Sequence, residues 1–578
     1  MAIDSKNFHR RLRLYAESHA GNVTMITALA ALPLFLSAGA AIDYASMTRD
    51  IAAFQAAADS AVVAVVASDK ARITGLSGAA LTQRMAELDT IATNYMKRNY
   101  TDRSGDTSSF DVTLTIDGQK VRLDVAHEVN VPILGSFGIL SPTVNITSEI
   151  KKAATPVELM LVMDTTGSMG TTYMAQAKTA AHNLLTKVYG GTLATEPESE
   201  YIRVGLVPFS GAVRLDTAAS DFNMSWIDTT GAAAVSKLNF SNSAWHNYMA
   251  WTQLLNQPWN GCVEARTGSY ATDDTAPGSG NTLFTPYFNP DEPTFSNSTS
   301  LPNNYLNSYI GSTGTPNETT GITTANCTGW SSSSTSTANL TCRQNNVSKY
   351  IAKSITAETN ASSSTGPWFN CAKSKLVSLT YDRSKVEAGI DAMTANGSTV
   401  IPEGLAWGWR AMSPTAPLTT VGASTSFPQT TIAPYGDARW QKIMVLMSDG
   451  ENDVLSNGGQ LSPLNGTWYS AYGRGKAATN NRFGLTSTQI SNFSSNPGVT
   501  ATALDTKMAA ICDNIKAQGI IIYSVGFRVN STAMQNCASP DTNVNNKHYS
   551  YAADGVALAA VFSHIGENVS NTSIYLSK

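Results

Sequence analysis

The chain is poor in charged residues and lacks the common enzyme motifs. Only 14% of its 578 residues are Asp, Glu, Lys or Arg, whereas soluble domains average about 25%. The 39 basic and 43 acidic residues leave a net charge of −4. This balance argues against nucleic acid as a partner, because nucleic acid needs a dense cationic surface. No CxxC, HExxH, GxxxxGK[ST] or GxSxG motif is present, so we expect a non-enzymatic protein.

One long uncharged segment lies near the N-terminus. Residues 23–42 carry no charge, and at ~1.5 Å per residue they match the ~30 Å core of a bilayer. Residues 1–22 form a basic tail, whereas Asp43 follows the segment, so the positive-inside rule places the N-terminus in the cytoplasm. We expect a transmembrane helix over 23–42. A cleaved signal peptide, with a site near Ala38-Gly39-Ala40, and a buried helix of a soluble protein are the alternatives.

Residues 43–150 predict a small helical and β-hairpin region. Apolar residues recur at three- and four-residue steps after Asp43, which predicts that the first helix continues well beyond the membrane segment. A second amphipathic helix is expected over 81–95. Alternating apolar residues on both sides of Asp117-Gly118 indicate a β-hairpin. By analogy, pilin-like proteins are built in this way.

Residues 151–578 have the sequence pattern of an α/β domain. Short runs rich in Ile, Val, Leu and Met at 157–163, 203–209, 442–447 and 520–525 alternate with helical stretches, which predicts a doubly wound, mostly parallel sheet covered on both faces. This alternation of strands and helices stops between about 211 and 379, where we expect an irregular insertion with a flexible segment near 296–345. The insertion is either a partner-binding surface or a variable decoration.

Oxygen-bearing side chains follow two of the predicted strands. The loop after 157–163 carries Asp164, Thr166 and Ser168, Asp449 follows the run at 442–447, and Thr399 lies between two helical stretches. In parallel sheets, ligands bind outside the carboxyl ends of the strands. Mg²⁺ is a hard ion that prefers about six oxygen ligands. We therefore expect these five residues to bind Mg²⁺, with Mn²⁺ and Ca²⁺ as alternatives, and to leave one position for an acidic group of a partner.

Three segments make this expectation more specific. The segments DTTGSM at 164–169, GSTVIPEGLAWG at 397–408 and MSDG at 447–450 resemble the three metal-site loops of a von Willebrand factor A domain. The resemblance implies that Asp164, Thr166, Ser168, Thr399 and Asp449 form a metal ion-dependent adhesion site. Thr166 stands where Ser is commoner in that family.

The full layout resembles the TadG-like proteins of Flp (tight adherence) pilus assembly, from about residue 18 to the end. The segment GNVTMITALAALPLFLSAGAAID at 21–43 and the run GLAWGWRAMSP at 404–414 carry this likeness. Related pilin-like members have a Glu early in the apolar run, but this chain has Thr24 to Thr27 there, so we do not expect processing as a pilin. The resemblance implies a single-pass protein of the bacterial inner membrane whose bulk is periplasmic.

All six cysteines follow the membrane segment, which fits an oxidising periplasm. They allow fifteen pairings. Proximity in the sequence favours Cys512–Cys537 and Cys327–Cys342, which leaves Cys262–Cys371 to bracket the insertion. Free buried thiols are the alternative.

Four functions remain open. The first is a membrane-anchored periplasmic protein of pilus assembly or adhesion, which binds other assembly or envelope proteins through the metal site. The second is a cleaved and secreted adhesin with the same site, and the third is a metal-free structural scaffold. The fourth is a hydrolase that would activate a water through a metal held by Asp164 and Asp449.

Overall fold

The computed structural model contains two compact units, which we describe separately. One comprises Met1–Ala154 and the other Thr155–Thr572, where the sequence predicted a boundary at 150/151. The structure describes residues 19–68, 78–100, 111–117, 120–129, 131–138, 141–151, 156–195, 198–240, 246–249, 258–292, 303, 305, 341, 344–345, 350, 366–454, 464–476, 481–492, 498–542 and 546–571.

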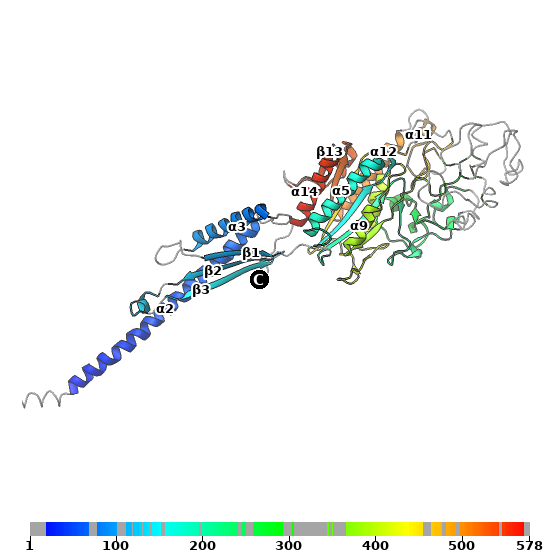
Figure 1. The fold of residues 1–578 in the computed structure, drawn as a ribbon. Coiled ribbons are helices and arrows are strands. Elements are labelled where there is room, and N and C mark those ends of the chain that lie inside the picture. Colours follow the sequence, from blue (N-terminus) through cyan, green and yellow to red (C-terminus); the bar gives the residue numbers. More distant parts are fainter. Residues whose placement is uncertain are drawn as a thin grey trace, which may run out of the picture. The chain divides into compact units, whose positions relative to one another are not determined.

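The N-terminal unit is built around one very long helix. Helix α2 (His19–Ala67) continues through Pro33, and α3 (Gly78–Asn99) packs on its C-terminal half (Figure 1). Strands β1 (Asp111–Asp117), β2 (Lys120–Glu128) and β3 (Thr143–Lys151) form an antiparallel sheet in that order. A four-residue helix, α4 (Pro132–Gly135), lies between β2 and β3. The hairpin was predicted, whereas β3 and α4 were not.

The core of this unit lies on the face of α2 that the apolar spacing predicts. Phe54, Ala58, Ala61 and Val65 are all buried there, and they belong to one cluster with residues of α3, β2 and β3. The preceding part of α2 is different, because its large apolar side chains are exposed: Met25, Ile26, Leu29, Leu32, Leu34 and Phe35. Among the described residues, Met25–Ala67 is the one helix that is long and apolar enough to cross a membrane.

The second unit contains a mixed sheet whose central strands are parallel. Its order is β13-β12-β11-β4-β5-β6-β7, and β8 pairs with β5. Five strands run parallel to one another: β4 (Val157–Asp164), β5 (Ile202–Phe209), β11 (Gln441–Ser448), β12 (Ile521–Phe527) and β13 (Tyr549–Ala552). Three shorter strands pair antiparallel with their neighbours: β6 (Val213–Arg214), β7 (Cys262–Val263) and β8 (Val377–Thr380). Strands β9 (Thr420–Val421) and β10 (Thr430–Thr431) form a separate pair.

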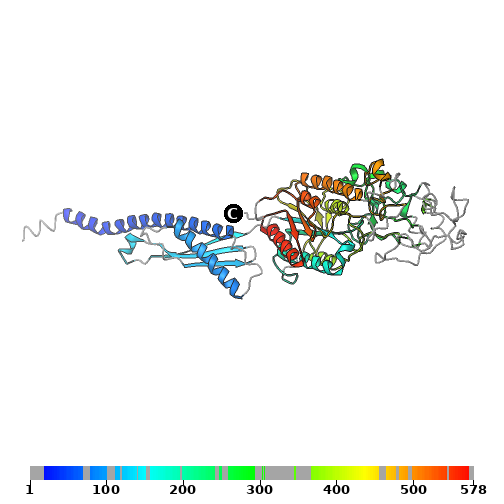
Figure 2. The ribbon, with the colours of Figure 1, turned by 90° about the horizontal axis from the view of Figure 1, so that it is seen from above.

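Helices cover both faces of this sheet. One face packs against α5 (Gly170–Tyr189), α9 (Arg383–Asp391) and α14 (Gly555–Asn571), and the other against α10 (Ile401–Arg410), α12 (Val499–Ala517) and α13 (Thr532–Cys537). Figure 2 shows α12 in orange and α14 in red on opposite sides of the strands. Strand β4 alternates accordingly, with Leu159 and Leu161 in one core and Met160 and Val162 in the other.

Helix α10 packs closely on the sheet because it carries two glycines on one face. A Cβ at Gly404 would lie 2.6 Å from Phe209 Cδ1, and a Cβ at Gly408 would lie 2.6 Å from Val162 Cγ2. Residues four positions apart share a helix face, so the two glycines together allow this contact. The run GLAWGWR therefore has a packing role in the structure.

The predicted insertion is irregular, but it is tied to the sheet. Within it, the short strands β6 and β7 extend the sheet beyond β5, and the disulfide Cys262–Cys371 links β7 to the segment that precedes β8. A second disulfide links Cys512 of α12 to Cys537 of α13. The predicted pair Cys327–Cys342 and most of the segment 296–345 lie outside the described residues. Further short helices among the described residues are η2 (Gly167–Met169), η3 (Met224–Trp226), η4 (Val235–Lys237), η6 (Gly268–Ala271), η7 (Gly280–Thr282) and α11 (Ser487–Ser491).

Candidate functional site

The strand order places the candidate site at a topological switch point. Without the two short strands β6 and β7 of the insertion, the sheet has six strands. Numbered along the chain, strands one to six are β4, β5, β8, β11, β12 and β13. Their order in the sheet is then 3-2-1-4-5-6, which is a common order of doubly wound folds. Strands β4 and β11 are the pair at which this order reverses, and ligands of such sheets bind at the carboxyl ends of that pair. Asp164 ends β4, and Asp449 directly follows β11.

Hydrogen bonds connect the two loops at this point. Ser168 Oγ donates to Asp449 Oδ1 at 2.6 Å, across 281 residues of sequence. The Oγ1 atom of Thr166 lies 2.9 Å from Ser168 Oγ. The backbone N–H of Thr166 donates to Asp164 Oδ1 at 2.7 Å. Four of the five predicted ligands thus form one continuous cluster of oxygens.

The fifth predicted ligand is held beside this cluster by backbone contacts. Thr399 exchanges hydrogen bonds with Asp453, with N–O distances of 2.8 and 2.9 Å. The N–H of Gly167 donates to the carbonyl of Gly397 at 2.8 Å, which ties the first loop to the Thr399 loop. A Cβ at Gly450 would lie 3.6 Å from Thr399 Oγ1 and 4.0 Å from Ser168 Oγ. The three segments identified in the sequence therefore meet at one place.

Burial increases from the mouth of the cluster to its base. Asp164 is 0% exposed and Thr166 is 1% exposed, whereas Asp449 is half-buried and Ser168 is exposed. An ion bound among these oxygens would therefore have solvent on the side of Ser168. That geometry suits a site that keeps a position for a water or for a group from another molecule.

The electrostatics of the two carboxyl groups are unfavourable for two negative charges. Burial raises the pKa of Asp164 to about 7, and the neighbouring Asp449 carboxylate contributes in the same direction. Hydrogen bonds from Ser448 and Thr166 oppose this shift. Burial also raises the pKa of Asp449, against the attraction of Arg528. A divalent cation would remove this conflict, because opposite charge favours the ionised forms.

The donor set fits a hard cation. It consists of two carboxyl groups and three hydroxyl groups, and such oxygen ligands are those that Mg²⁺ and Ca²⁺ prefer. Among the described residues, no group of three or more His, Cys, Asp or Glu is arranged to hold a metal ion, at this site or at any other, so hydroxyl groups would have to complete the ligand set here. Thr166, Ser168 and Thr399 are suited to direct contact with an ion, and the two carboxyl groups to direct or water-mediated contact.

Two residues of this region were missed in the sequence. Ser448 donates a hydrogen bond to Asp164 Oδ2, so the last residue of β11 positions the buried carboxyl group. Arg528 directly follows β12 and has a positive φ of 64°. Its guanidinium carbon lies 3.9 Å from the centroid of the Tyr173 ring. The Ser448 position was visible within MSDG, whereas no local signal marks Arg528.

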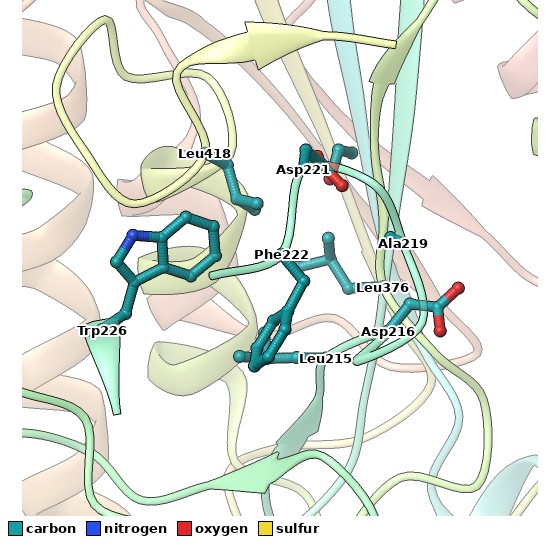
Figure 3. A pocket seen from close by; sticks show the side chains of 9 residues that line it. Leu215, Asp216, Ala219, Asp221, Phe222, Trp226, Leu376 and Leu418 are labelled. Atoms are coloured by element: carbon teal, nitrogen blue, oxygen red, sulfur yellow. The ribbon is translucent and has the colours of Figure 1, made fainter. Parts of the chain in front are cut away.

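A pocket in the insertion shares no residue with the oxygen cluster. Its cavity volume is only about 10 Å³, far below the roughly 300–1,000 Å³ of typical small-molecule sites. Asp216 and Asp221 line it together with a mostly apolar wall: Leu215, Phe222, Trp226, Leu376 and Leu418 (Figure 3). We therefore regard the oxygen cluster as the main candidate site.

Comparisons with known proteins add little. No protein-family model matches the chain, and no curated protein matches it. One similar solved structure is the pilus adhesin SpaC from Lactobacillus rhamnosus GG, with a TM-score of 0.26 and 11% sequence identity. The match covers 80% of this chain and 34% of the adhesin, so the chain spans about a third of that protein. A likeness this low carries no argument about fold or function.

Proposed function

We propose that the oxygen cluster binds a divalent cation, Mg²⁺ in the first place, and that the bound ion recruits an acidic side chain of a partner protein. The observation that carries this proposal is the convergence of Asp164, Thr166, Ser168, Thr399 and Asp449 at the switch point of the sheet. The raised pKa of the buried Asp164 supports it, because a bound cation would compensate that charge.

We further propose that the second unit is a von Willebrand factor A domain and that the cluster is its metal ion-dependent adhesion site. Support comes from the order of the six strands and from the resemblance of the three loops. In this arrangement the bound metal would supply an electrophilic position for a carboxylate. The residues of this chain would hold the ion and fix the direction of that position. Neither role requires catalysis, so we propose a non-enzymatic protein.

The proposed cellular role is a membrane-anchored periplasmic protein of Flp pilus assembly or adhesion. The exposed apolar part of α2 supports a single-pass anchor, and the basic residues before it support a cytoplasmic N-terminus. The two disulfides support an oxidising compartment for the rest of the chain. The assignment to pilus assembly and to the inner membrane rests on the sequence resemblance, as does the expectation that the partners are other pilus assembly or envelope proteins.

Two adjacent threonines provide a sharp test of the metal site. Thr166 Oγ1 lies in the cluster, whereas Thr165 Oγ1 donates to the carbonyl of Phe209 at 2.9 Å. We expect Thr166→Val to weaken Mg²⁺ and Mn²⁺ binding in titration calorimetry and Thr165→Val to leave it unchanged. Equal binding by both variants and the wild type would contradict the site.

Two of the other candidate functions, the metal-free scaffold and the secreted adhesin, make different predictions. In the structure, Thr166, Ser168 and Asp449 hydrogen-bond to one another, which would suffice for a metal-free scaffold. That candidate predicts no saturable Mg²⁺ or Mn²⁺ binding by the wild type. A secreted adhesin predicts a mature N-terminus near Ala41, which N-terminal sequencing of the exported protein would detect.

A further inference from the structure

The turn that contains α4 is apolar and partly exposed. Residues 131–138 read Val-Pro-Ile-Leu-Gly-Ser-Phe-Gly and carry no charged side chain. Ile133 and Leu134 are half-buried, whereas Phe137 is 54% exposed. An exposed aromatic side chain beside partly exposed aliphatic ones, on an uncharged turn, has the composition of segments that lie in the interfacial region of a bilayer.

The α4 turn is fixed to one particular turn of helix α2. A Cβ at Gly39 would lie 2.5 Å from Ile133 Cγ2, so this glycine allows the turn to approach α2 closely. The backbone N–H groups of Ile133 and Leu134 donate to the carboxylate oxygens of Asp43 at 3.4 and 2.7 Å. Asp43 is 1% exposed as a result.

This attachment determines the depth of the turn relative to the membrane segment. Gly39 belongs to the uncharged segment 23–42, and Asp43 is the first charged residue after it. The two residues are four positions apart, which corresponds to ~6 Å along the axis of an α-helix. Ile133, packed on Gly39, must therefore lie at the level of the last turn of the apolar segment.

We propose that the α4 turn, residues 131–138, is a second and shallow membrane contact, which enters the interfacial region of the bilayer on the side where the bulk of the chain lies. The inference rests on the proposed transmembrane placement of α2. Its chemistry is that of an interfacial apolar segment, in which aromatic and aliphatic side chains contact the boundary between head groups and acyl chains.

The arrangement also explains why a buried carboxylate is tolerated at the membrane boundary. An unpaired carboxylate near hydrocarbon is costly, but Asp43 accepts two backbone hydrogen bonds from α4. The same two bonds prevent the turn from moving away from α2. A second contact of this kind would restrict rotation of α2 about its own axis.

Depth-dependent quenching of a fluorescent label tests the inference. The full-length Phe137→Cys variant would be labelled with an environment-sensitive fluorophore without reductant, because the described cysteines are all in disulfides. It would be reconstituted into lipid vesicles that carry nitroxide groups at shallow or deep positions. Phe35→Cys is the control within the apolar segment, and Tyr95→Cys, at a side chain of α3 that is 42% exposed, is the control outside it.

We expect the label at 137 to show a blue-shifted emission and strong quenching by shallow nitroxides, the label at 35 to be quenched by deep nitroxides, and the label at 95 to be affected by neither. A label at 137 that behaves like the label at 95, while the label at 35 is quenched, would overturn the inference and leave the transmembrane anchor intact. An unquenched label at 35 would overturn both. Rapid disulfide formation between two unlabelled Phe137→Cys chains would show that a second copy covers the turn, which also overturns the inference.

Discussion

The raised pKa of Asp164 makes a specific prediction for the pH dependence of metal binding. Raising this pKa from 3.8 to about 7 makes ionisation cost on the order of 4 kcal/mol more in the folded chain than in the unfolded one. Because the pKa is raised, the contribution of this carboxyl group to stability is fully present below pH ~4 and is lost as the pH rises to about 7. A bound cation restores that contribution, since it stabilises the ionised form.

Mg²⁺ must therefore compete with a proton below pH 7. We expect the apparent Kd to become about tenfold weaker for each pH unit below 7 and to level off above it, as for the displacement of one proton. At pH 7, where about half of the Asp164 carboxyl groups are protonated, binding should release a fraction of a proton. Titration calorimetry of the full-length protein in buffers of different ionisation enthalpy measures both quantities.

The matched control is Thr165→Val, which should reproduce the wild-type profile because its hydroxyl is outside the cluster. A Kd that stays constant between pH 5 and 8, together with a binding enthalpy that does not depend on the buffer, would refute the reasoning. In that case Asp164 would not be the group that gives up its proton when the ion binds.

Three further predictions concern stability, and chemical denaturation measures each of them. Replacing Cys512 and Cys537 together by Ala should lower the free energy of unfolding by about 3 kcal/mol, because the disulfide closes a 25-residue separation; no change would contradict a disulfide between them. Gly408→Ala should cost about 1–3 kcal/mol through overpacking against Val162, whereas Gly278→Ala, which meets nothing closer than 3.9 Å, should be nearly neutral. Glu158→Gln should cost about 3–5 kcal/mol, because Arg203 and Lys442 both pair with this fully buried carboxylate; a neutral result would show that other groups satisfy the two cations.

Much of the fold follows from local pattern. Strands β4, β5, β11 and β12 each coincide with a mostly apolar run, because strands that are buried on both faces consist largely of apolar residues. The charged exceptions within these runs are Glu158, Arg203 and Lys442, and Glu158 forms ion pairs with the other two. Strand β13 was missed, since Tyr549–Ala552 is short and only partly buried at the edge of the sheet. Strand β8 was missed because it contributes four residues at the end of an irregular insertion. In both cases pairing with a longer strand, rather than local sequence, determines the structure.

The candidate site was predictable for a similar reason. Asp164, Thr166 and Ser168 lie within five residues and follow a strand, so local sequence places them together. Asp449 required the expectation that the carboxyl ends of parallel strands share one edge. Thr399 lies between two helices, so only the resemblance of its loop to a metal-site loop pointed to it. Arg528 and the Asp43–α4 contact were not predictable, because each depends on distant segments that meet only in the folded chain.

Locating the bound ion is the most direct test of the proposed metal site. Crystals of the protein grown with Mn²⁺ would give an anomalous difference map in which the metal itself is visible. We expect a single strong peak at the carboxyl ends of β4 and β11, within about 2.0–2.3 Å of oxygen atoms of Ser168 and its neighbours in the cluster. A map with no peak there, in which Ser168 still donates its hydrogen bond to Asp449, would contradict the central claim.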